Sequence, residues 1–400
     1  MTGPLDDVLV VDLTRALAGP HATMMLGDLG ARIVKVEAPG TGDDTRSWGP
    51  PFVQPDGAGR ESTYFLSTNR NKESITLDLK SGQDRNVLLT LVDDADVLVE
   101  NFRTGVLERL GLGADTLLER NPRLVLLSIS GFGHDGPEGG RAGYDQIAQG
   151  EAGVMSLTGP VPTEPQKVGV PIGDLLAGMY GAYGVLAALH ERERTGRGQV
   201  VRTSLLSALV GVHAFQGTRW TVTGEVGRAR GNHHPSISPY GLFRCRDGAV
   251  QIALGSEALW RRFCTEFGLD PHTEGMASNP ERVAARDQVI ALVESAFAEW
   301  DAMPLLARLA EVGVPAGKVR SLDEVYEWEQ TRSQGLLVEV EHDTLGTVTL
   351  PGPPLRFFDA DGAETTRRVH RAPPTLDADG SAIRAWAARR GTDDPAAPTP

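Results

Sequence analysis

Residues 169–189 read GVPIGDLLAGMYGAYGVLAAL, and the rest of the chain is organised around this stretch. It opens as a turn, because Pro171 fixes its own φ and Gly173 tolerates backbone angles that other residues avoid. From Leu175 to Leu189 no residue is charged, and apolar side chains recur at helical spacing among Ala and Gly. The pattern predicts a fully buried helix with one carboxylate, Asp174, at its N-terminus. The uncharged run is too short to span a membrane.

Asp174 has two interpretations. An aspartate at a helix start is most often an N-cap that accepts backbone hydrogen bonds. Three features favour a nucleophile instead. Glycines on both sides leave room for a ligand, the apolar helix places the carboxylate at the edge of a dry core, and the helix dipole favours its ionised form. We therefore take Asp174 as the candidate catalytic residue.

The composition limits the class of protein. The chain has 400 residues, of which 40% are hydrophobic, enough for a substantial core in two domains. A formal net charge of −14 argues against nucleic acid or an anionic membrane as a general partner. With two cysteines and no signal-peptide pattern, we expect a cytoplasmic protein. Neither the adjacent His233 and His234 nor the isolated His134 predicts a metal site.

Short apolar runs alternate with helical patterns in the first half of the chain. Strands are predicted at residues 8–13, 32–37, 74–79, 96–100, 124–130 and 199–203, with helices at 20–29 and 85–92 between them. Such alternation predicts an α/β fold with a doubly wound parallel sheet. The first turn, residues 15–20, lacks the G-x-G-x-x-G pattern, so dinucleotide binding is not expected.

Basic residues follow the predicted strands. In open α/β sheets, ligands bind beyond the carboxyl ends of the strands. Arg46, Lys80, Arg103 and Arg109 lie in loops or at helix ends of this region. Taken singly, each is more often an ordinary solvated charge, whereas together they could bind phosphates.

The composition changes after residue 212. Residues 213–239 are rich in Gly, Arg and Pro and are interpreted as a linker. Arg246-Asp-Gly248 separates two strand-like segments and predicts a hairpin, and three helical patterns follow it. We expect a small α+β domain over residues 240–330 and a disordered tail at 389–400.

Seven short motifs occur in order along the chain: AGP at 18–20 with LGARIVKVE at 29–37; GDDTR at 42–46; NK at 71–72 with ITLDLK at 75–80; ENF at 100–102 with RLG at 109–111; GYD at 143–145; GD at 173–174; and TGRGQ at 195–199. Together they resemble the class III CoA-transferases, the family that also contains formyl-CoA and carnitine CoA-transferases and α-methylacyl-CoA racemases. The resemblance extends over about residues 5–385.

The resemblance implies a large doubly wound domain built from residues 1–212 and 331–388, and two chains interlocked as a ring-like dimer. It implies coenzyme A thioesters as substrates, with no metal or redox cofactor. Asp174 would then attack an acyl-CoA to form a mixed anhydride, and the released thiolate would convert this to an aspartyl-CoA thioester. An acceptor carboxylic acid would repeat these steps in reverse. Water must be kept from the anhydride, which an apolar helix favours.

The expected CoA contacts lie at strand ends and in the matched motifs. Lys80, Arg103 and Arg109 would meet the CoA phosphates. The full set of expected CoA-binding residues is Leu17, Ala18, Arg46, Leu77, Lys80, Asn101, Phe102, Arg103, Arg109, Tyr144 and Asp145.

Departures from the family pattern bear on the reaction. Racemases have Gly-His-Asp where this chain has Gly143-Tyr144-Asp145, and a phenol with a pKa of ~10 is a poor proton shuttle. This favours transfer over racemisation. The single glycine in Leu254-Gly-Ser-Glu257 argues against oxalate and formate, and Leu17 and Ala38 replace Gln and Arg of some relatives. The segment Pro235–Tyr240 suggests succinyl-CoA as the donor. A racemase and a non-catalytic CoA-ester-binding protein are the alternatives.

Overall fold

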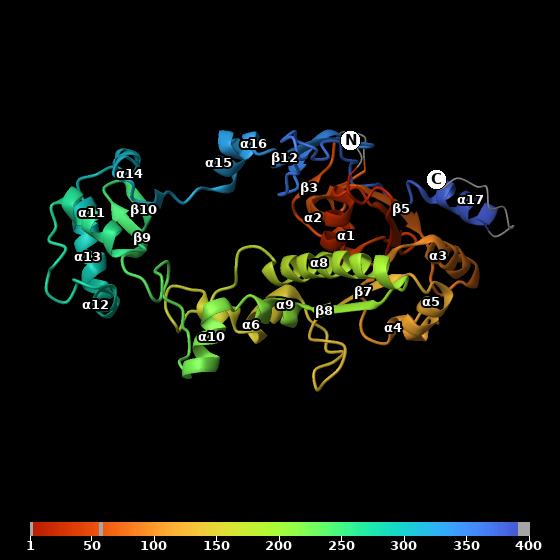
Figure 1. The fold of residues 1–400 in the computed structure, drawn as a ribbon. Coiled ribbons are helices and arrows are strands. Elements are labelled where there is room, and N and C mark those ends of the chain that lie inside the picture. Colours follow the sequence, from red (N-terminus) through yellow and green to blue (C-terminus); the bar gives the residue numbers. More distant parts are fainter. Residues whose placement is uncertain (1–2, 56–58, 391–400) are drawn as a thin grey trace. The chain divides into compact units, whose positions relative to one another are not determined.

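The structure is a computed structural model that describes residues 3–55 and 59–390 (Figure 1). The chain divides into two compact units. Unit 1 comprises Met1–Val154, Val168–Thr223 and Glu329–Pro400, and unit 2 comprises Met155–Lys167 and Gly224–Trp328. Both ends of the chain therefore contribute to unit 1. Of the tail expected to be disordered, residues 391–400 lie outside the described residues.

A six-stranded parallel sheet forms the centre of unit 1. Its strands, in spatial order, are β5 (Lys72–Thr76), β2 (Arg32–Glu37), β1 (Leu9–Asp12), β6 (Val97–Glu100), β7 (Val125–Ser130) and β8 (Val200–Ser204). Every neighbouring pair is parallel, which confirms the predicted sheet. The strand order reverses between β1 and β6. The carboxyl ends of these two strands are thus the switch point at which doubly wound folds bind ligands.

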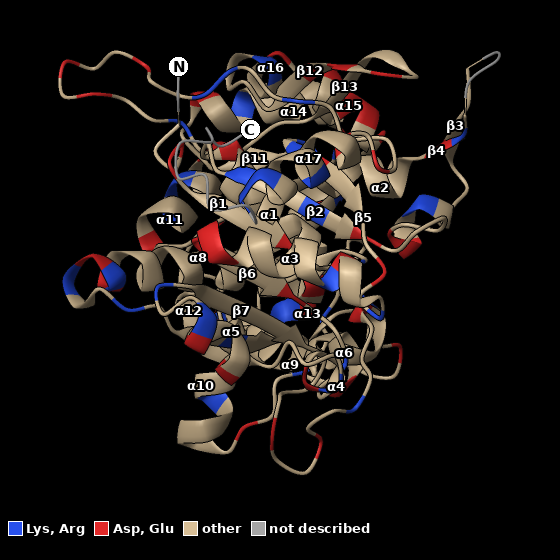
Figure 2. Ribbon diagram, turned by 90° about the vertical axis from the view of Figure 1, so that its right-hand side faces the viewer, with Lys and Arg blue, Asp and Glu red and all other residues tan. Residues whose placement is uncertain are grey.

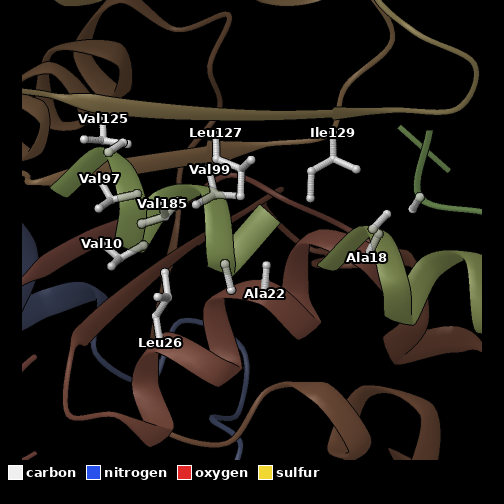
Figure 3. Close-up of a cluster of buried hydrophobic side chains, with 14 of the residues drawn as sticks. Val10, Ala18, Ala22, Leu26, Val97, Val99, Val125, Leu127, Ile129 and Val185 are labelled. Carbon is white, nitrogen blue, oxygen red and sulfur yellow. The ribbon is translucent and has the colours of Figure 1, made fainter. Parts of the chain in front are cut away.

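Helices cover both faces of this sheet because side chains alternate between its faces. One face packs against α1 (Ala18–Asp28), α6 (Asp145–Glu151), α8 (Ile172–Thr195) and α9 (Leu205–Gly211). Figure 3 shows part of this core, in which Val10, Val97, Val99, Val125 and Leu127 of the strands lie with Ala22 and Leu26 of α1 and Val185 of α8. The other face packs against α3 (Gly82–Asp94), α4 (Val106–Arg109), α5 (Ala114–Arg120) and α17 (Gly380–Arg390). The ribbon of β7 is tan in Figure 2, because none of its residues is charged.

Helix α8 is longer and less buried than its sequence predicts. It has 24 residues and continues beyond the uncharged run, through the charged segment 190–195, to Thr195. Its small residues are buried against α1, β7 and β8, whereas Met179, Tyr180 and Tyr183 are 48%, 40% and 71% exposed. The predicted full burial is therefore wrong. The buried face consists mostly of glycine and alanine with Val185 and Leu189, whereas the methionine and the two tyrosines point away from the core. The helix is long and apolar enough to cross a membrane, but its packing is that of a core helix.

The remaining elements are shorter. In unit 1 they are η1 (Asp44–Ser47), β3 (Phe52–Val53), β4 (Glu61–Ser62), α2 (Thr63–Thr68), α10 (Ala214–Thr223), α16 (Glu329–Ser333), β12 (Leu337–His342) and β13 (Gly346–Pro351), while α7 (Val154–Leu157) lies at the unit boundary. Unit 2 contains β9 (Tyr240–Cys245), β10 (Gly248–Ala253), β11 (Ala316–Gly317), α11 (Glu257–Phe267), α12 (Asn279–Ala284), α13 (Arg286–Phe297), α14 (Ala302–Glu311) and α15 (Leu322–Glu327). Its core includes Phe243, Trp260, Phe263 and Phe297.

Two segments lie in a different unit from the one expected. Residues 155–167 belong to unit 2 because backbone hydrogen bonds connect them to the next part of that unit: Ala229 N donates to Ser156 O over 3.0 Å, and Gly231 N donates to Gly159 O over 2.9 Å. Residues 214–223 form helix α10 of unit 1 rather than a linker. The glycine, arginine and proline that suggested a linker are concentrated beyond residue 223.

The close approach of α8 to α1 gives a test of the packing. A Cβ atom on Gly178 would lie 2.6 Å from the carbonyl oxygen of Ala18, so the two helices would have to move apart. We expect Gly178→Ala to lower the free energy of unfolding by about 1–3 kcal/mol. Gly82→Ala, whose Cβ would meet nothing within 4 Å, is the control. It should leave stability within about 0.5 kcal/mol or raise it slightly. Equal denaturation midpoints for the two variants would contradict this packing.

Candidate active site

A cavity of about 550 Å³ lies at the switch point of the sheet. Its walls come from the segments that follow β1, β2, β5 and β6, as the fold predicts. The lining residues are Leu13, Thr14, Arg15, Val36, Glu37, Ala38, Pro39, Gly42, Asp43, Leu77, Asp78, Leu79, Lys80, Phe102, Val106, Arg109 and Leu110. The structure thus brings together four of the residues expected to bind CoA: Leu77, Lys80, Phe102 and Arg109.

The charges around this cavity favour an anion. Its lining includes three cations, Arg15, Lys80 and Arg109. Two lining acids are paired with cations outside the lining. Glu37 binds Arg46 through two contacts of 2.7 Å, and Asp43 lies 2.9 Å from the fully buried ammonium of Lys35. These two acids are therefore neutralised. The third lining acid, Asp78, has no ion pair among the described residues, so three cations face one unpaired acid and the cavity keeps a positive balance for a ligand.

Arg46 lies differently from our expectation. Its guanidinium is held by Glu37, donates to the carbonyl of Pro374 over 3.1 Å and stacks on the ring of Phe65. It is absent from the residues that line the cavity, and so are Asn101 and Arg103. Motif matching could not show this, because the partner Glu37 and the carbonyl of Pro374 meet Arg46 only in the folded chain.

Hydrogen bonds from two side chains hold the loop between β1 and α1 beside the cavity. The side chain of Asn101 clamps Arg15 by accepting from its backbone N over 2.9 Å and donating to its carbonyl over 2.7 Å. Ala16 has a φ of 63°, and its N–H donates to Asp43. Leu17 and Ala18 are buried at the start of α1. Asn101, Leu17 and Ala18 therefore fix the conformation of the loop without lining the cavity. The loop connects the cavity to α1, the helix that packs against α8.

The N-terminus of α8 is capped by Asp145 rather than by Asp174. Asp145 Oδ1 accepts from Gly173 N over 2.7 Å and from Asp174 N over 3.4 Å. Gln149 donates to the other oxygen of Asp145 over 2.6 Å and fixes the carboxylate. The capping interpretation of Asp174 therefore loses its basis. A carboxylate that lies 29 residues before Asp174 supplies the cap, which no local sequence pattern could reveal.

The environment of Asp174 favours its protonated form. Burial, with an added contribution from the charge of Asp145, raises the pKa of Asp174 to about 7. The helix dipole, which we expected to favour the ionised form, is opposed at this position by desolvation and by a second carboxylate. A carboxyl group of this pKa is partly ionised near neutral pH and more basic than an ordinary aspartate, as catalytic groups often are.

Two tyrosines accompany this carboxylate pair. Tyr64 of α2 was not expected from the sequence. Its pKa is raised by burial and by the charges of Asp174 and Asp145, and its ring packs edge-on against Trp48 at 5.1 Å between centroids. Tyr144 precedes α6 and is 67% exposed. In sequence, Tyr64 shows only as an aromatic residue in a short helix, so nothing local marks it.

Comparison with known proteins identifies the family of this chain. The model of CoA-transferase family III matches residues 5–380. A mouse succinyl-CoA:glutarate CoA-transferase is 38% identical over 88% of this chain and 80% of its own length. An acetyl-CoA:oxalate CoA-transferase of Acetobacter aceti is 37% identical over 96% of this chain and 95% of its own. A CAIB/BAIF family protein from Brucella suis has a solved structure with a TM-score of 0.84 and 38% identity, which covers 97% of this chain and all of that one. The chain therefore belongs to CoA-transferase family III and is an enzyme of this class.

Proposed function

We propose that this enzyme transfers CoA from succinyl-CoA to a dicarboxylic acid, with Asp174 as the nucleophile. The observation that carries the proposal is the carboxyl group of Asp174 at the start of an apolar helix. It does not cap the helix, because Asp145 does, and its pKa is raised. Helix α8 leads directly into β8, so its N-terminus lies toward the carboxyl edge of the sheet, the edge at which the cationic cavity opens. The nucleophile and the CoA cavity would thus lie at the same edge of the sheet.

The reaction needs two acyl exchanges at this carboxylate. An ionised oxygen of Asp174 attacks the thioester carbonyl, and the C–S bond breaks to give a mixed anhydride and CoA thiolate. The thiolate attacks the aspartyl carbonyl, which forms an aspartyl-CoA thioester and releases the donor acid. The acceptor carboxylate then attacks this thioester, which expels CoA thiolate and forms a second mixed anhydride. The thiolate attacks the acceptor acyl carbonyl of this anhydride, which gives the new acyl-CoA and releases the carboxylate of Asp174. Each step conserves charge, and the apolar surroundings limit hydrolysis of the anhydride.

The names of the relatives support the choice of substrates. The two relatives named above act on glutarate and oxalate, which are both dicarboxylates, and the mouse enzyme is named for succinyl-CoA. Our sequence argument against oxalate stays a prediction. Initial rates with succinyl-CoA or acetyl-CoA against glutarate, mesaconate, oxalate and acetate test the assignment. Faster transfer to acetate than to any dicarboxylate would contradict it. Exchange of an α-proton without an acceptor would indicate a racemase instead.

We also propose that the enzyme acts as a homodimer with interlocked chains, and a cytoplasmic location stays our prediction. Large apolar side chains lie exposed on α8, α10 and the turn between α9 and α10, including Met179, Tyr183, Val212, Phe215, Trp220 and Val222. Exposed apolar side chains in such number are typical of an interface. Light scattering that gives the mass of a single chain at micromolar concentration would contradict the dimer.

Substitution of Asp174 tests the nucleophile directly. Asp174→Asn keeps the shape but loses the charge, so transfer should fall more than about 1,000-fold while the protein stays folded. Asp115→Asn, an exposed acid on α5, is the control. Acyl-CoA with hydroxylamine should add ~15 Da to the wild-type peptide that contains Asp174, because hydroxylamine traps activated carboxylates. A label on Asp145 would show that the nucleophile is misassigned.

The raised pKa predicts opposite effects of pH on activity and stability. Activity needs the ionised form, so kcat/KM should fall as pH drops below about 7. The folded-state pKa of about 7 lies above the ordinary 3.8, so the favoured protonated form stabilises the fold at low pH, and this contribution is lost as pH rises through 7. Asp174→Asn should thus be more stable than wild type at pH 8, by up to about 4 kcal/mol, and equally stable near pH 4. Chemical denaturation at both pH values measures the difference. A variant less stable than wild type at pH 8 would contradict the raised pKa.

The cationic cavity predicts how CoA binds. Lys80→Ala and Arg109→Ala should each raise the KM for acyl-CoA by about 5- to 30-fold, because a charge-assisted contact with phosphate is lost. The effect should shrink at high salt, which screens such contacts. Arg194→Ala, an exposed arginine near the end of α8, should leave KM unchanged. An unchanged KM in both cavity variants would show that this cavity does not bind CoA.

A further inference from the structure

A row of hydrogen-bonded side chains lies behind Phe102, where β6 and β7 end. Glu100 accepts from the backbone N of Phe102 over 2.8 Å with one carboxylate oxygen and hydrogen-bonds Ser128 with the other. Ser128 Oγ lies 2.6 Å from His134 Nε2. On its far side, His134 Nδ1 lies 3.5 Å from Ser130 Oγ, which accepts from Gly133 N over 3.1 Å. None of these side chains lines the cavity.

The row has one consistent direction of donation when Glu100 is ionised. A carboxylate has no proton, so the hydroxyl of Ser128 must donate to Glu100. Ser128 can then accept from His134, which places the imidazole proton on Nε2 and leaves Nδ1 to accept from Ser130. Burial, and next the charge of Arg202, lower the pKa of His134, so the neutral ring that this order requires is favoured.

The carboxyl group of Glu100 makes the row unusual. Its side chain is only 7% exposed, and within the described part of the chain its hydrogen bonds come from Ser128 and Phe102, with no ion pair. A buried acid without an ion pair is costly, and burial raises the pKa of Glu100. Ordinary strand packing would not need an acid here. Groups of this kind are more frequent at functional sites.

Phe102 connects the row to the CoA cavity. Its side chain lines the cavity, and the guanidinium of Arg15 lies over its ring, 5.2 Å from the centroid. The backbone amide that Glu100 holds therefore sets the position of one wall of the cavity. The other end of the row lies in the loop after β7, where Gly131 and Gly143 approach so closely that a Cβ on Gly131 would lie 2.8 Å from Gly143 N. That contact fixes the base of the loop, and with it Tyr144 and Asp145, independently of His134.

We propose that His134 is a positioning residue of the acyl-CoA site, which acts through Ser128 and Glu100 to hold Phe102 at the cavity wall. This inference deepens the proposed function and rests on the cavity being the CoA site. Because the loop base is fixed separately, loss of the His134 contact should weaken CoA binding without disturbing the carboxylate pair. The effect belongs to the substrate's KM and not to kcat.

Two substitutions of one position separate positioning from fold. The amide nitrogen of a glutamine can reach the place of His134 Nε2 and donate to Ser128, whereas an asparagine is too short and meets only the Nδ1 side. His134→Asn should raise the KM for acyl-CoA and the Kd for free CoA by about 3- to 10-fold, the range for one lost hydrogen bond, with kcat within twofold. His134→Gln should stay within twofold of wild type for both constants. His190→Asn, an exposed histidine on α8, is the control.

Calorimetry with free CoA keeps this test separate from the catalytic role of Asp174, since binding involves no turnover. Ser128→Ala should raise the Kd as His134→Asn does, and the double variant should be no weaker than either single one, because both break the same row. An unchanged Kd in His134→Asn would overturn the proposal. Equal loss in the Gln and Asn variants, with both melting at lower temperature, would also overturn it, since the histidine would then act only on the fold. If Lys80→Ala and Arg109→Ala leave the Kd unchanged, the cavity assignment fails instead.

Discussion

The fully buried ammonium of Lys72 fixes the parts of unit 1 that carry the site. It binds Asp12 at the end of β1 over 3.0 Å, the carbonyl of Pro20 in α1 over 2.9 Å and Asn69 before β5 over 2.9 Å. Burial lowers the pKa of Lys72 to about 8, while the charges of Lys72 and Lys35, against the opposing effect of burial, lower the pKa of Asp12. Each charge depends on its partner, because an unpaired ion in this interior would be far costlier than the pair. The path of the chain from β1 into α1 is thereby determined.

The close contact between α1 and α8 depends on this path of the chain from β1 into α1. Gly178 meets the backbone of α1, and Gly181 lies so near β7 that a Cβ there would come within 2.9 Å of Leu127. Small residues on one face of α8 thus let it pack closely against α1 and β7, and the partial burial of Asp174 at its N-terminus accompanies this packing. The raised pKa follows in turn from that burial and from the neighbouring cap, Asp145. The packing of α8 therefore also contributes to the raised pKa of the candidate nucleophile.

The sequence predicts what depends on local pattern. Five of the six strands of the sheet agree with the apolar runs to within one residue at each end, and the hairpin β9–β10 follows from Arg246-Asp-Gly248. Strand β5 begins earlier, at Lys72, because a lysine does not look like a buried residue in sequence. Of the expected CoA contacts, four in the segments that follow β5 and β6 line the cavity: Leu77, Lys80, Phe102 and Arg109. The functions of Asp145, Asn101 and Arg46 depend on partners distant in sequence, which no periodicity reveals. The exposed face of α8 was missed because an uncharged helix was assumed to be buried all round.

The two halves of the site need opposite electrostatics, and the fold keeps them on different elements. Lys80 and Arg109 belong to segments after β5 and β6, where they can attract a polyanion. Asp174 lies at the start of α8, where the charge that acts on it is that of Asp145. Were those cations beside Asp174, they would lower its pKa and reduce its basicity, since a nearby positive charge stabilises the carboxylate. A long ligand such as CoA can connect the two, because its phosphates and its thioester lie at opposite ends. The separation therefore permits strong anion binding and a basic carboxylate in the same unit.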